Sequence, residues 1–242
     1  MNYCIFVQAR LSSSRSPGKV LADIEGKPML LRQLQRIRHG VNDIDVICVT
    51  SNDKSDDPIE ELCSNNNFSF FRGSLNNVLQ RYIDAADEFN IKNIIRIGGD
   101  DPLADHNSVT KLISEHNDED FLYTSHRSGW PYGTASELIK VSALRKIATL
   151  TTEELYKEHI IPFFWHNPDR FDMKKVFSPD SICRPEYYFS VDYEEDLQLI
   201  RNIFKLLKNK GEFFNLKDVI NLCDNQKDIL EINKHLHSGF DF

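Results

Sequence analysis

Short apolar runs alternate with longer amphipathic segments through the first hundred residues. Runs rich in β-branched and aromatic residues are too short for helices and predict buried strands, at 5–7, 44–50, 68–71 and 93–97. Between them, apolar residues recur every three or four positions, which predicts helices, two of them capped by Asp57 and Ser74. Because alternating strands and helices build parallel sheets, we expect an α/β fold with an open, mostly parallel sheet flanked by helices.

The pattern becomes less regular after residue 118. Short strands are predicted at 121–124, 137–140, 171–176 and 187–191. Helices are predicted at 143–150, 153–165, 197–207 and 219–222, followed by a polar tail. A chain of 242 residues requires no second core, so we expect one domain, 1–242, in which 121–180 is a small excursion after the fourth strand.

Composition and charge narrow the class of protein. Hydrophobic residues make up 40% and charged residues 27%, which is typical of soluble globular proteins. The net charge of -8 argues against nucleic acids or anionic membranes as partners, since both attract an excess of cations. Five cysteines without C-x-x-C spacing indicate free thiols in a reducing cytosol rather than disulfides or a zinc site. With no apolar run near 18 residues and no secretion signal, we expect a cytoplasmic protein that does not span a membrane.

A basic, serine-rich loop, residues 9–19, follows the first predicted strand. Arg10, Arg15 and Lys19 lie within ten residues and are interleaved with serines and Gly18. A polyphosphate requires positive charge, close backbone approach and short hydroxyl or amide donors, all of which this loop supplies. Its spacing is not that of a Walker A loop, and the alternative is a solvated basic loop without a ligand.

Two aspartates follow predicted strands at distant positions. Asp100 comes after the fourth strand and two glycines, and Asp192 ends the strand predicted at 187–191. Ligands of open α/β sheets collect at the carboxyl ends of the strands. Paired carboxylates there suit Mg²⁺, which takes further oxygens from water and phosphates. The alternative is that each aspartate only caps the helix that follows it.

The basic loop resembles a family signature. QARLSSSRSPGKVL is similar to QAR-x-x-S-S-R-x-P-G-K-V-L of the CTP-using nucleotidyltransferases that make CMP-sugars, in the spore-coat polysaccharide protein F branch. IIRIGGDDPLAD and FSVDYEEDLQLIRNIF resemble R-I-T-G-D-C-P-L-I-D and V-D-T-P-E-D-L-x-L-V-R of that family. In the wider superfamily, which includes 3-deoxy-manno-octulosonate and acylneuraminate cytidylyltransferases, the aspartates that match Asp100 and Asp192 bind magnesium. Asp101 departs from the pattern and is expected to be a neighbour of the metal site at most.

The resemblance implies a nucleotide-diphospho-sugar transferase fold, related to the Rossmann fold, and roles for several residues. Arg10 and Lys19 are the expected catalytic residues, and Asp100 and Asp192 the expected Mg²⁺ ligands. The residues of the loop expected to hold CTP are Ala9, Arg10, Ser14, Arg15 and Lys19.

Two further segments extend the resemblance. FRGSLNNVLQRY resembles R-G-S-x-x-D-V-L-x-R-Y and implies that Arg72, Gly73 and Ser74 line the cytidine pocket, although Arg72 could equally be an ordinary surface residue. KEHIIPFFW resembles R-E-H-V-T-P-Y and implies that Glu158 and His159 lie near the acceptor.

One departure concerns the acceptor. Where relatives read P-D-G-x-D-x-E, this chain reads PYGTASE, so both aspartates are missing and Glu137 remains as an expected acceptor residue. The change points to an atypical acceptor or to lost activity.

The expected reaction is CTP + sugar → CMP-sugar + pyrophosphate in glycan biosynthesis, and the expected partners are CTP, a sugar or sugar-acid acceptor and a second copy of the chain, bound through 121–165. One alternative is a metal-dependent glycosyltransferase, although the D-x-D motif of that class is absent from GGDDP. The other is a nucleotide-binding homologue without catalysis.

Overall fold

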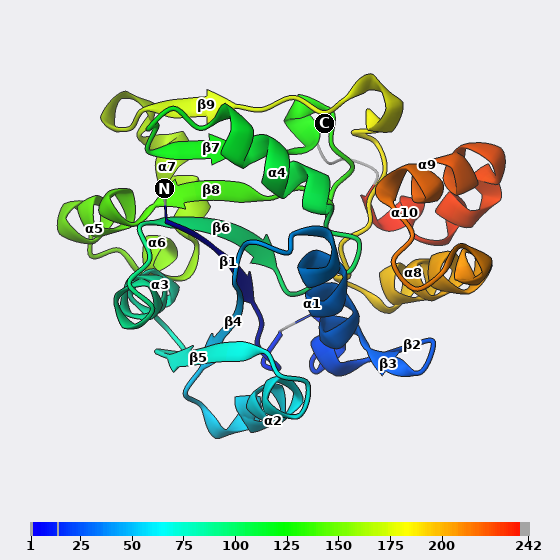
Figure 1. The fold of residues 1–242 in the computed structure, drawn as a ribbon, viewed down its shortest axis with the longest axis horizontal. Coiled ribbons are helices and arrows are strands. Elements are labelled where there is room, and N and C mark those ends of the chain that lie inside the picture. The colour runs from blue at the N-terminus through cyan, green and yellow to red at the C-terminus, as the bar shows by residue number, and fades with distance from the viewer. Residues whose placement is uncertain (1, 14, 238–242) are drawn as a thin grey trace.

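A central sheet of seven strands organises the computed structural model, which describes residues 2–13 and 15–237. The strand order is β5-β4-β1-β6-β8-β7-β9 (Figure 1). The strands of this sheet are β1 (Tyr3–Gln8), β4 (Val46–Ser51), β5 (Ser69–Gly73), β6 (Asn93–Gly98), β7 (Phe121–Tyr123), β8 (Glu137–Lys140) and β9 (Met173–Lys175). β1, β4, β5 and β6 pair in parallel, whereas β8 runs antiparallel to β6 and β7. The predicted α/β fold with a mostly parallel sheet is confirmed.

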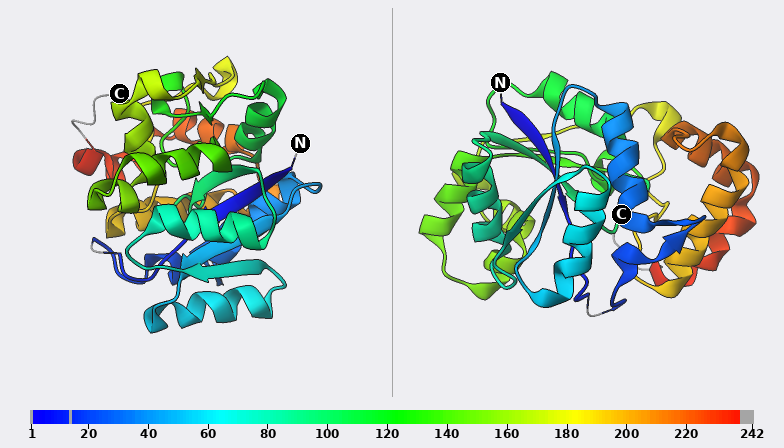
Figure 2. Two further views of the ribbon diagram at one scale, coloured as in Figure 1. Left: turned by 90° about the vertical axis from the view of Figure 1, so that its left-hand side faces the viewer. Right: turned by 60° about the horizontal axis from the view of Figure 1, so that its bottom comes forward.

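Helices cover both faces of the sheet (Figure 2). They are α1 (Met29–Gly40), α2 (Asp57–Asn65), α3 (Val78–Glu88), α4 (His106–Glu115), α5 (Val141–Leu150), α6 (Glu154–Glu158), α7 (Ile160–His166), α8 (Glu194–Leu206), α9 (Leu216–Asn225) and α10 (Lys234–His237). A small antiparallel pair, β2 (Asp23–Ile24) and β3 (Lys27–Pro28), precedes α1. No helix among the described residues is both long and apolar enough to cross a bilayer.

The side chains of β1 show why this strand lies at the centre. Ile5 and Val7 join a core with α1, α4, α8 and α9, while Cys4 and Phe6 join a second core on the opposite face with α3, α5 and α7. A parallel strand that is buried on both faces has an unbroken apolar sequence, as 5–7 does. Its two polar ends, Tyr3 and Gln8, are only half-buried.

The strand predicted at 187–191 is not part of the sheet. This segment is extended and buried, but its only ladder contact among the described residues is an isolated parallel bridge between Tyr132 and Tyr188. Further on, the backbone N–H of Val191 donates to the carbonyl of Asp100 at 2.8 Å. The apolar pattern of this segment therefore correctly indicated that it is buried, but not that it would pair in the sheet. The segment crosses the edge of the sheet at the end of β6.

The single helix predicted at 153–165 is broken into α6 and α7 at His159, whose φ of -116° and ψ of 94° are not helical. Pro162 explains the break, because a proline ring collides with the carbonyl four residues earlier in a continuous helix, here that of Glu158. The break turns Glu158 and His159 toward the carboxyl edge of the sheet, where both line a cavity.

The helix caps and the chain end also differ from the predictions. Asp57 is the first residue of α2 rather than its cap, and Asn77, not Ser74, caps α3 by accepting from the N–H of Gln80 at 2.9 Å. The expected polar tail instead lengthens α9 and adds a 3₁₀ helix, Lys227–Ile232, and α10. α8, α9 and α10 lie together beside the sheet in Figure 1.

Candidate active site

The basic loop begins where β1 ends, at the carboxyl edge of the sheet. The N–H of Gly18 donates to the carbonyl of Leu11 at 2.9 Å and so closes the loop on itself. Gly18 has φ 75°, a left-handed conformation that glycine adopts without steric cost. Asp56, which is fully buried, accepts from the N–H of Leu11 at 2.7 Å and ties the loop to the end of β4. Ser14 lies outside the described residues.

Lys19 joins the loop to both predicted carboxylates. Its side chain is 6% exposed, and its Nζ donates to Asp100 Oδ2 at 2.9 Å and to Asp192 Oδ1 at 3.1 Å. A third donation goes to the carbonyl oxygen of Val191 at 2.5 Å. The structure therefore brings together the three distant segments that the sequence analysis selected.

Asp192 is held in its charged form. Arg15 Nη2 lies 2.6 Å from its Oδ1, and the hydroxyl of Tyr188 donates to its Oδ2 at 2.7 Å. Burial alone would raise the pKa of this carboxyl, but the Tyr188 hydrogen bond and the charges of Lys19 and Arg15 outweigh burial and lower it. Asp192 is accordingly an anion in the folded protein at neutral pH.

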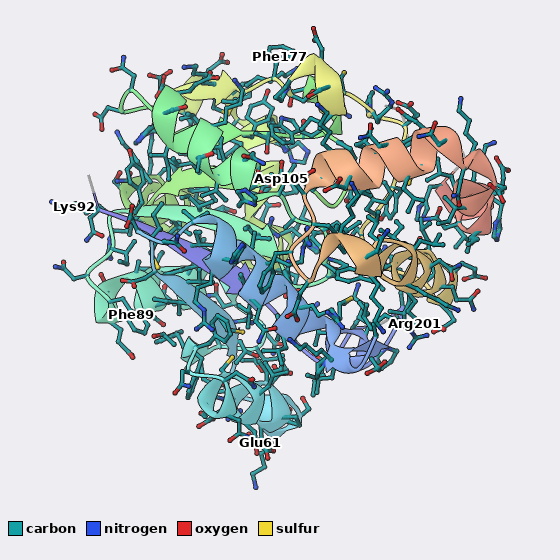
Figure 3. All side chains as sticks on the ribbon, turned by 45° about the vertical axis from the view of Figure 1, so that its right-hand side comes forward. Glu61, Phe89, Lys92, Asp105, Phe177 and Arg201 are labelled. Atoms are coloured by element: carbon teal, nitrogen blue, oxygen red, sulfur yellow. The ribbon has the colours of Figure 1, made fainter. Side chains whose placement is uncertain are left out.

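Neither aspartate caps a helix, which removes the simpler alternative. Asp105 caps α4 by accepting from the N–H of Asn107 at 3.2 Å, and Figure 3 shows it at the start of that helix. α8 begins with a capping box in which Asp196 accepts from the N–H of Tyr193.

Asp196 also holds Asp192 in position through its backbone N–H, a role that the sequence did not predict. Its Oδ2 accepts from the N–H of Asp192 at 2.9 Å, while Asn233 Nδ2 and His237 Nε2 lie 2.8 and 2.7 Å from its Oδ1. The His237 ring stacks on Tyr188 with 3.4 Å between centroids. The last described residues thus brace the aspartate that contacts Lys19.

Two glycines allow close contacts where β6 ends, Gly98 with carboxyl groups and Gly99 with the backbone at the end of β1. A Cβ on Gly98 would lie 2.7 Å from Asp100 Oδ1 and 2.8 Å from Asp101 Oδ2. A Cβ on Gly99 would lie 2.6 Å from the carbonyl oxygen of Gln8. Burial, followed by the charge of Asp100, raises the pKa of Asp101 to about 8. Asp101 is therefore largely protonated at neutral pH.

A first cavity of about 520 Å³ opens beside the basic loop. The predicted residues that line it are Ala9, Arg10, Arg15, Lys19, Asp100, Glu158 and His159. Arg10 Nη2 lies 2.7 Å from Glu158 Oε1, so Glu158 contacts the loop directly. Glu158 thus belongs to the loop side of the site, whereas the sequence analysis expected it near the acceptor; its role stays a prediction.

A second cavity of about 670 Å³ adjoins the first, and the two share Arg15, Arg96, Gly98, Asp100, His159 and Ile161. One wall carries carboxylates, from Asp100, Asp101 and Asp192. Other lining residues are Glu137, Thr124, Ser125, Ser190, three aromatic residues (Tyr123, Tyr132 and Trp165) and two further cations (Arg127 and Lys175). Glu137 faces Arg96 across the β6–β8 pair, with Oε2 3.1 Å from Nη1.

Arg72, Gly73 and Ser74 line neither of these two cavities in the part of the chain that the structure describes. Arg72 instead donates to the carbonyls of Ser51 and Asp53 and lies 2.6 Å from Glu60 Oε2. These contacts hold the connection between β4 and α2, and the cytidine role of the three residues stays a prediction.

Comparison with known proteins places this geometry in a family. The sequence matches the family described as Cytidylyltransferase over residues 4–236. The chain belongs to the cytidylyltransferase family. This membership confirms the resemblance found in the sequence.

The cytidylyltransferase is similar to named relatives along most of its length. It is 29% identical to the spore coat polysaccharide biosynthesis protein SpsF of Bacillus subtilis, over 85% of this chain and 88% of that protein. A solved cytidylyltransferase from Leptospira borgpetersenii has a TM-score of 0.88 and 27% identity, covering 95% of this chain and 97% of that one. CMP:2-keto-3-deoxy-manno-octonic acid synthetase, solved with CTP, shares the fold with a TM-score of 0.63 and 17% identity, covering 85% and 99%.

The carboxylates of this cytidylyltransferase fit a magnesium ion only together with substrate oxygens. Asp100 and Asp192 converge on one ammonium group, so they can converge on one cation. Among the described residues, no group of three or more His, Cys, Asp or Glu side chains is arranged to hold an ion. Mg²⁺ in nucleotide enzymes commonly uses one or two carboxylates and completes its shell with phosphates and water.

Proposed function

We propose that this cytidylyltransferase transfers CMP from CTP to a hydroxyl of a sugar acid and releases pyrophosphate, in the biosynthesis of a surface polysaccharide. The observation that supports the proposal best is the pair of adjoining cavities that share Asp100 and Arg15. The first has the cations that a triphosphate requires, and the second offers a separate space for an acceptor.

In the proposed reaction, the acceptor oxygen attacks the α-phosphorus, the bond from that phosphorus to the β-phosphate oxygen breaks, and the hydroxyl proton passes to solvent. Arg10, Arg15 and Lys19 hold the triphosphate and neutralise the leaving pyrophosphate, which lowers the barrier of an in-line displacement. Asp100 and Asp192 would hold Mg²⁺, which supplies charge neutralisation and a lower pKa for the attacking hydroxyl.

The second cavity supports an anionic acceptor. Arg127 and Lys175 line it, and neither forms an ion pair with the other described residues. Tyr123, Tyr132 and Trp165 offer flat apolar surface for the ring of a sugar. We place the acid group of the acceptor at Arg127 and Lys175, with Glu137 and His159 beside the sugar.

The test is pyrophosphate release with CTP and a panel of sugar acids and matched neutral sugars, with ATP, GTP and UTP as alternative donors. We expect release only with CTP and an acidic sugar. Arg127→Ala should raise the acceptor KM roughly tenfold or more, since a charge-assisted hydrogen bond contributes about 1.5–3 kcal/mol. The KM for CTP should stay unchanged.

Lys205→Ala, an exposed change on α8, is the control and should alter neither constant. CTP binding without release on any acceptor would instead favour a non-catalytic homologue, and release from a CMP-sugar would favour a glycosyltransferase. Equal turnover of neutral and acidic sugars would rule out the anionic acceptor.

We also propose that the enzyme is a cytoplasmic homodimer that pairs through 121–165. Two large apolar side chains of this segment, Leu150 and Leu155, are 40% and 50% exposed. The five cysteines are free, which suits a reducing compartment. Light scattering of the purified protein measures the dimer directly, and Leu155→Glu should shift it toward monomer.

A further inference from the structure

The ammonium group of Lys19 has the surroundings of a bound metal ion. An ammonium has three N–H donors, and here all three meet protein oxygens, from Asp100, Val191 and Asp192, at 2.9, 2.5 and 3.1 Å. Two of these oxygens are carboxylates and one is a backbone carbonyl. Carboxylate and carbonyl oxygens are also the ligands that hard divalent cations prefer.

The charge of Lys19 is bound tightly in this position. Its side chain is only 6% exposed, and Asp100 Oδ2 and Asp192 Oδ1 lie 2.9 and 3.1 Å from its Nζ. The side chain emerges from the closed end of the basic loop, directly after Gly18, and lines the first cavity. The ammonium therefore lies between two places that need a cation: the carboxylate pair and the space for the triphosphate.

We propose that Lys19 is a resident cation that occupies the magnesium position of the free enzyme and exchanges with Mg²⁺ when CTP binds. This inference rests on the proposed assignment of Asp100 and Asp192 as the metal ligands. When the triphosphate attracts the ammonium, Asp100 and Asp192 lose the cation that they share, Arg15 remains beside Asp192, and a divalent cation replaces the charge that has left. Metal and nucleotide binding are consequently coupled, and by thermodynamic linkage each strengthens the other to the same degree.

Metal binding without nucleotide tests the exchange. Lys19→Met keeps most of the side-chain length but removes the charge, so Asp100 and Asp192 should bind Mn²⁺ directly. Measured by electron paramagnetic resonance of free Mn²⁺, the variant should bind at least tenfold more tightly than wild type in the absence of CTP. Lys27→Met, at a surface lysine paired with Glu212, should match wild type. Lys19→Gln is a second variant if the methionine variant does not fold.

The outcomes separate this inference from the metal assignment. The exchange is wrong, and the metal site stands, if two results are found together. Wild type binds Mn²⁺ in the presence of CTP, and without CTP the Lys19 variants bind Mn²⁺ no more tightly than wild type does. The metal assignment itself is overturned if wild type with CTP binds Mn²⁺ no more tightly than CTP alone does, and if adding Asp100→Asn to Lys19→Met leaves the Mn²⁺ affinity without CTP unchanged. Tight binding in Lys19→Met that Asp100→Asn abolishes supports both.

Discussion

Asp56→Asn tests how strongly the basic loop is anchored to the sheet. The buried carboxylate accepts from the backbone N–H of Leu11 at 2.7 Å, from the N–H of Ser51 at 3.3 Å and from the Ser51 hydroxyl. An asparagine of the same shape retains one acceptor oxygen and presents an amide N–H₂ where the other oxygen was. One of the two backbone donors therefore faces another donor.

The magnitude follows from these contacts. A buried N–H without a partner costs about 1–3 kcal/mol, and the remaining hydrogen bonds lose the strength that the negative charge gives them. We expect Asp56→Asn to lower the free energy of unfolding by about 2–4 kcal/mol, a large part of the 5–15 kcal/mol typical of a folded domain. Because Leu11 belongs to the loop, the KM for CTP should rise as well.

Urea unfolding followed by circular dichroism measures the stability, and steady-state kinetics measures the KM. Asp53→Asn is the matched control, because Asp53 is exposed and caps a short 3₁₀ turn, a position where asparagine serves equally well. A loss below about 1 kcal/mol for Asp56→Asn would refute the reasoning, since it is less than the cost of one orphaned buried donor.

Gly99→Ala should weaken CTP binding at least tenfold with little change in circular dichroism, because the new Cβ would lie 2.6 Å from the Gln8 carbonyl and 2.8 Å from the Ala9 Cβ; unchanged titration calorimetry would contradict this. Asp224→Asn should lower the free energy of unfolding at pH 7 by about 1–2 kcal/mol, because it removes charge-assisted hydrogen bonds from Arg184 and Tyr187. The hydrogen bond from Arg184 and then that from Tyr187 lower the pKa of Asp224, so this stabilisation is complete above the unfolded pKa of about 3.9 and disappears as the pH falls through the lower folded value. The melting temperatures of variant and wild type should therefore converge below about pH 4, and a constant difference would contradict the assignment.

Elements whose structure is determined by their own residues could be predicted from the sequence. The apolar run at 5–7 became β1, because a strand buried on both faces has an apolar sequence, and the run at 93–97, apolar except for Asn93 and Arg96, became β6. The run at 187–191 has the same pattern without the same pairing, because Tyr188, Phe189 and Val191 are buried against loops and helices rather than in the ladder. The apolar pattern of a segment predicts that it is buried, whereas the strand with which it pairs depends on residues far away in the sequence.

The candidate site was predictable where residue type alone selects a chemistry. Cations in a serine-rich loop and aspartates at strand ends indicated Arg15, Lys19, Asp100 and Asp192, which the fold brings together. Supporting groups such as Asp196 and His237 carried no such signal, since a carboxylate in a first turn and a histidine in a polar tail are common. The proline in 153–165 was the one visible sign of the break at His159.

Exposed positions contributed least to the prediction. Phe177, 62% exposed and projecting from the edge of the molecule in Figure 3, directly follows the strand predicted at 171–176, and its residue type alone gives no sign of this exposure. Single exposed aromatic residues are common on protein surfaces.

The contact between Lys19 and Asp192 spans 173 positions of sequence, which has a consequence for biosynthesis. At ribosomal rates of about 5–20 residues per second, roughly 9 to 35 seconds pass between the synthesis of the lysine and that of its aspartate. Asp100 follows the lysine by 81 positions, so for roughly the first half of that interval the ammonium has neither carboxylate, and until Asp192 is made it has only one of the two. Water must solvate the ammonium during this time. The interior around this lysine can therefore dry only after most of the polypeptide has left the ribosome.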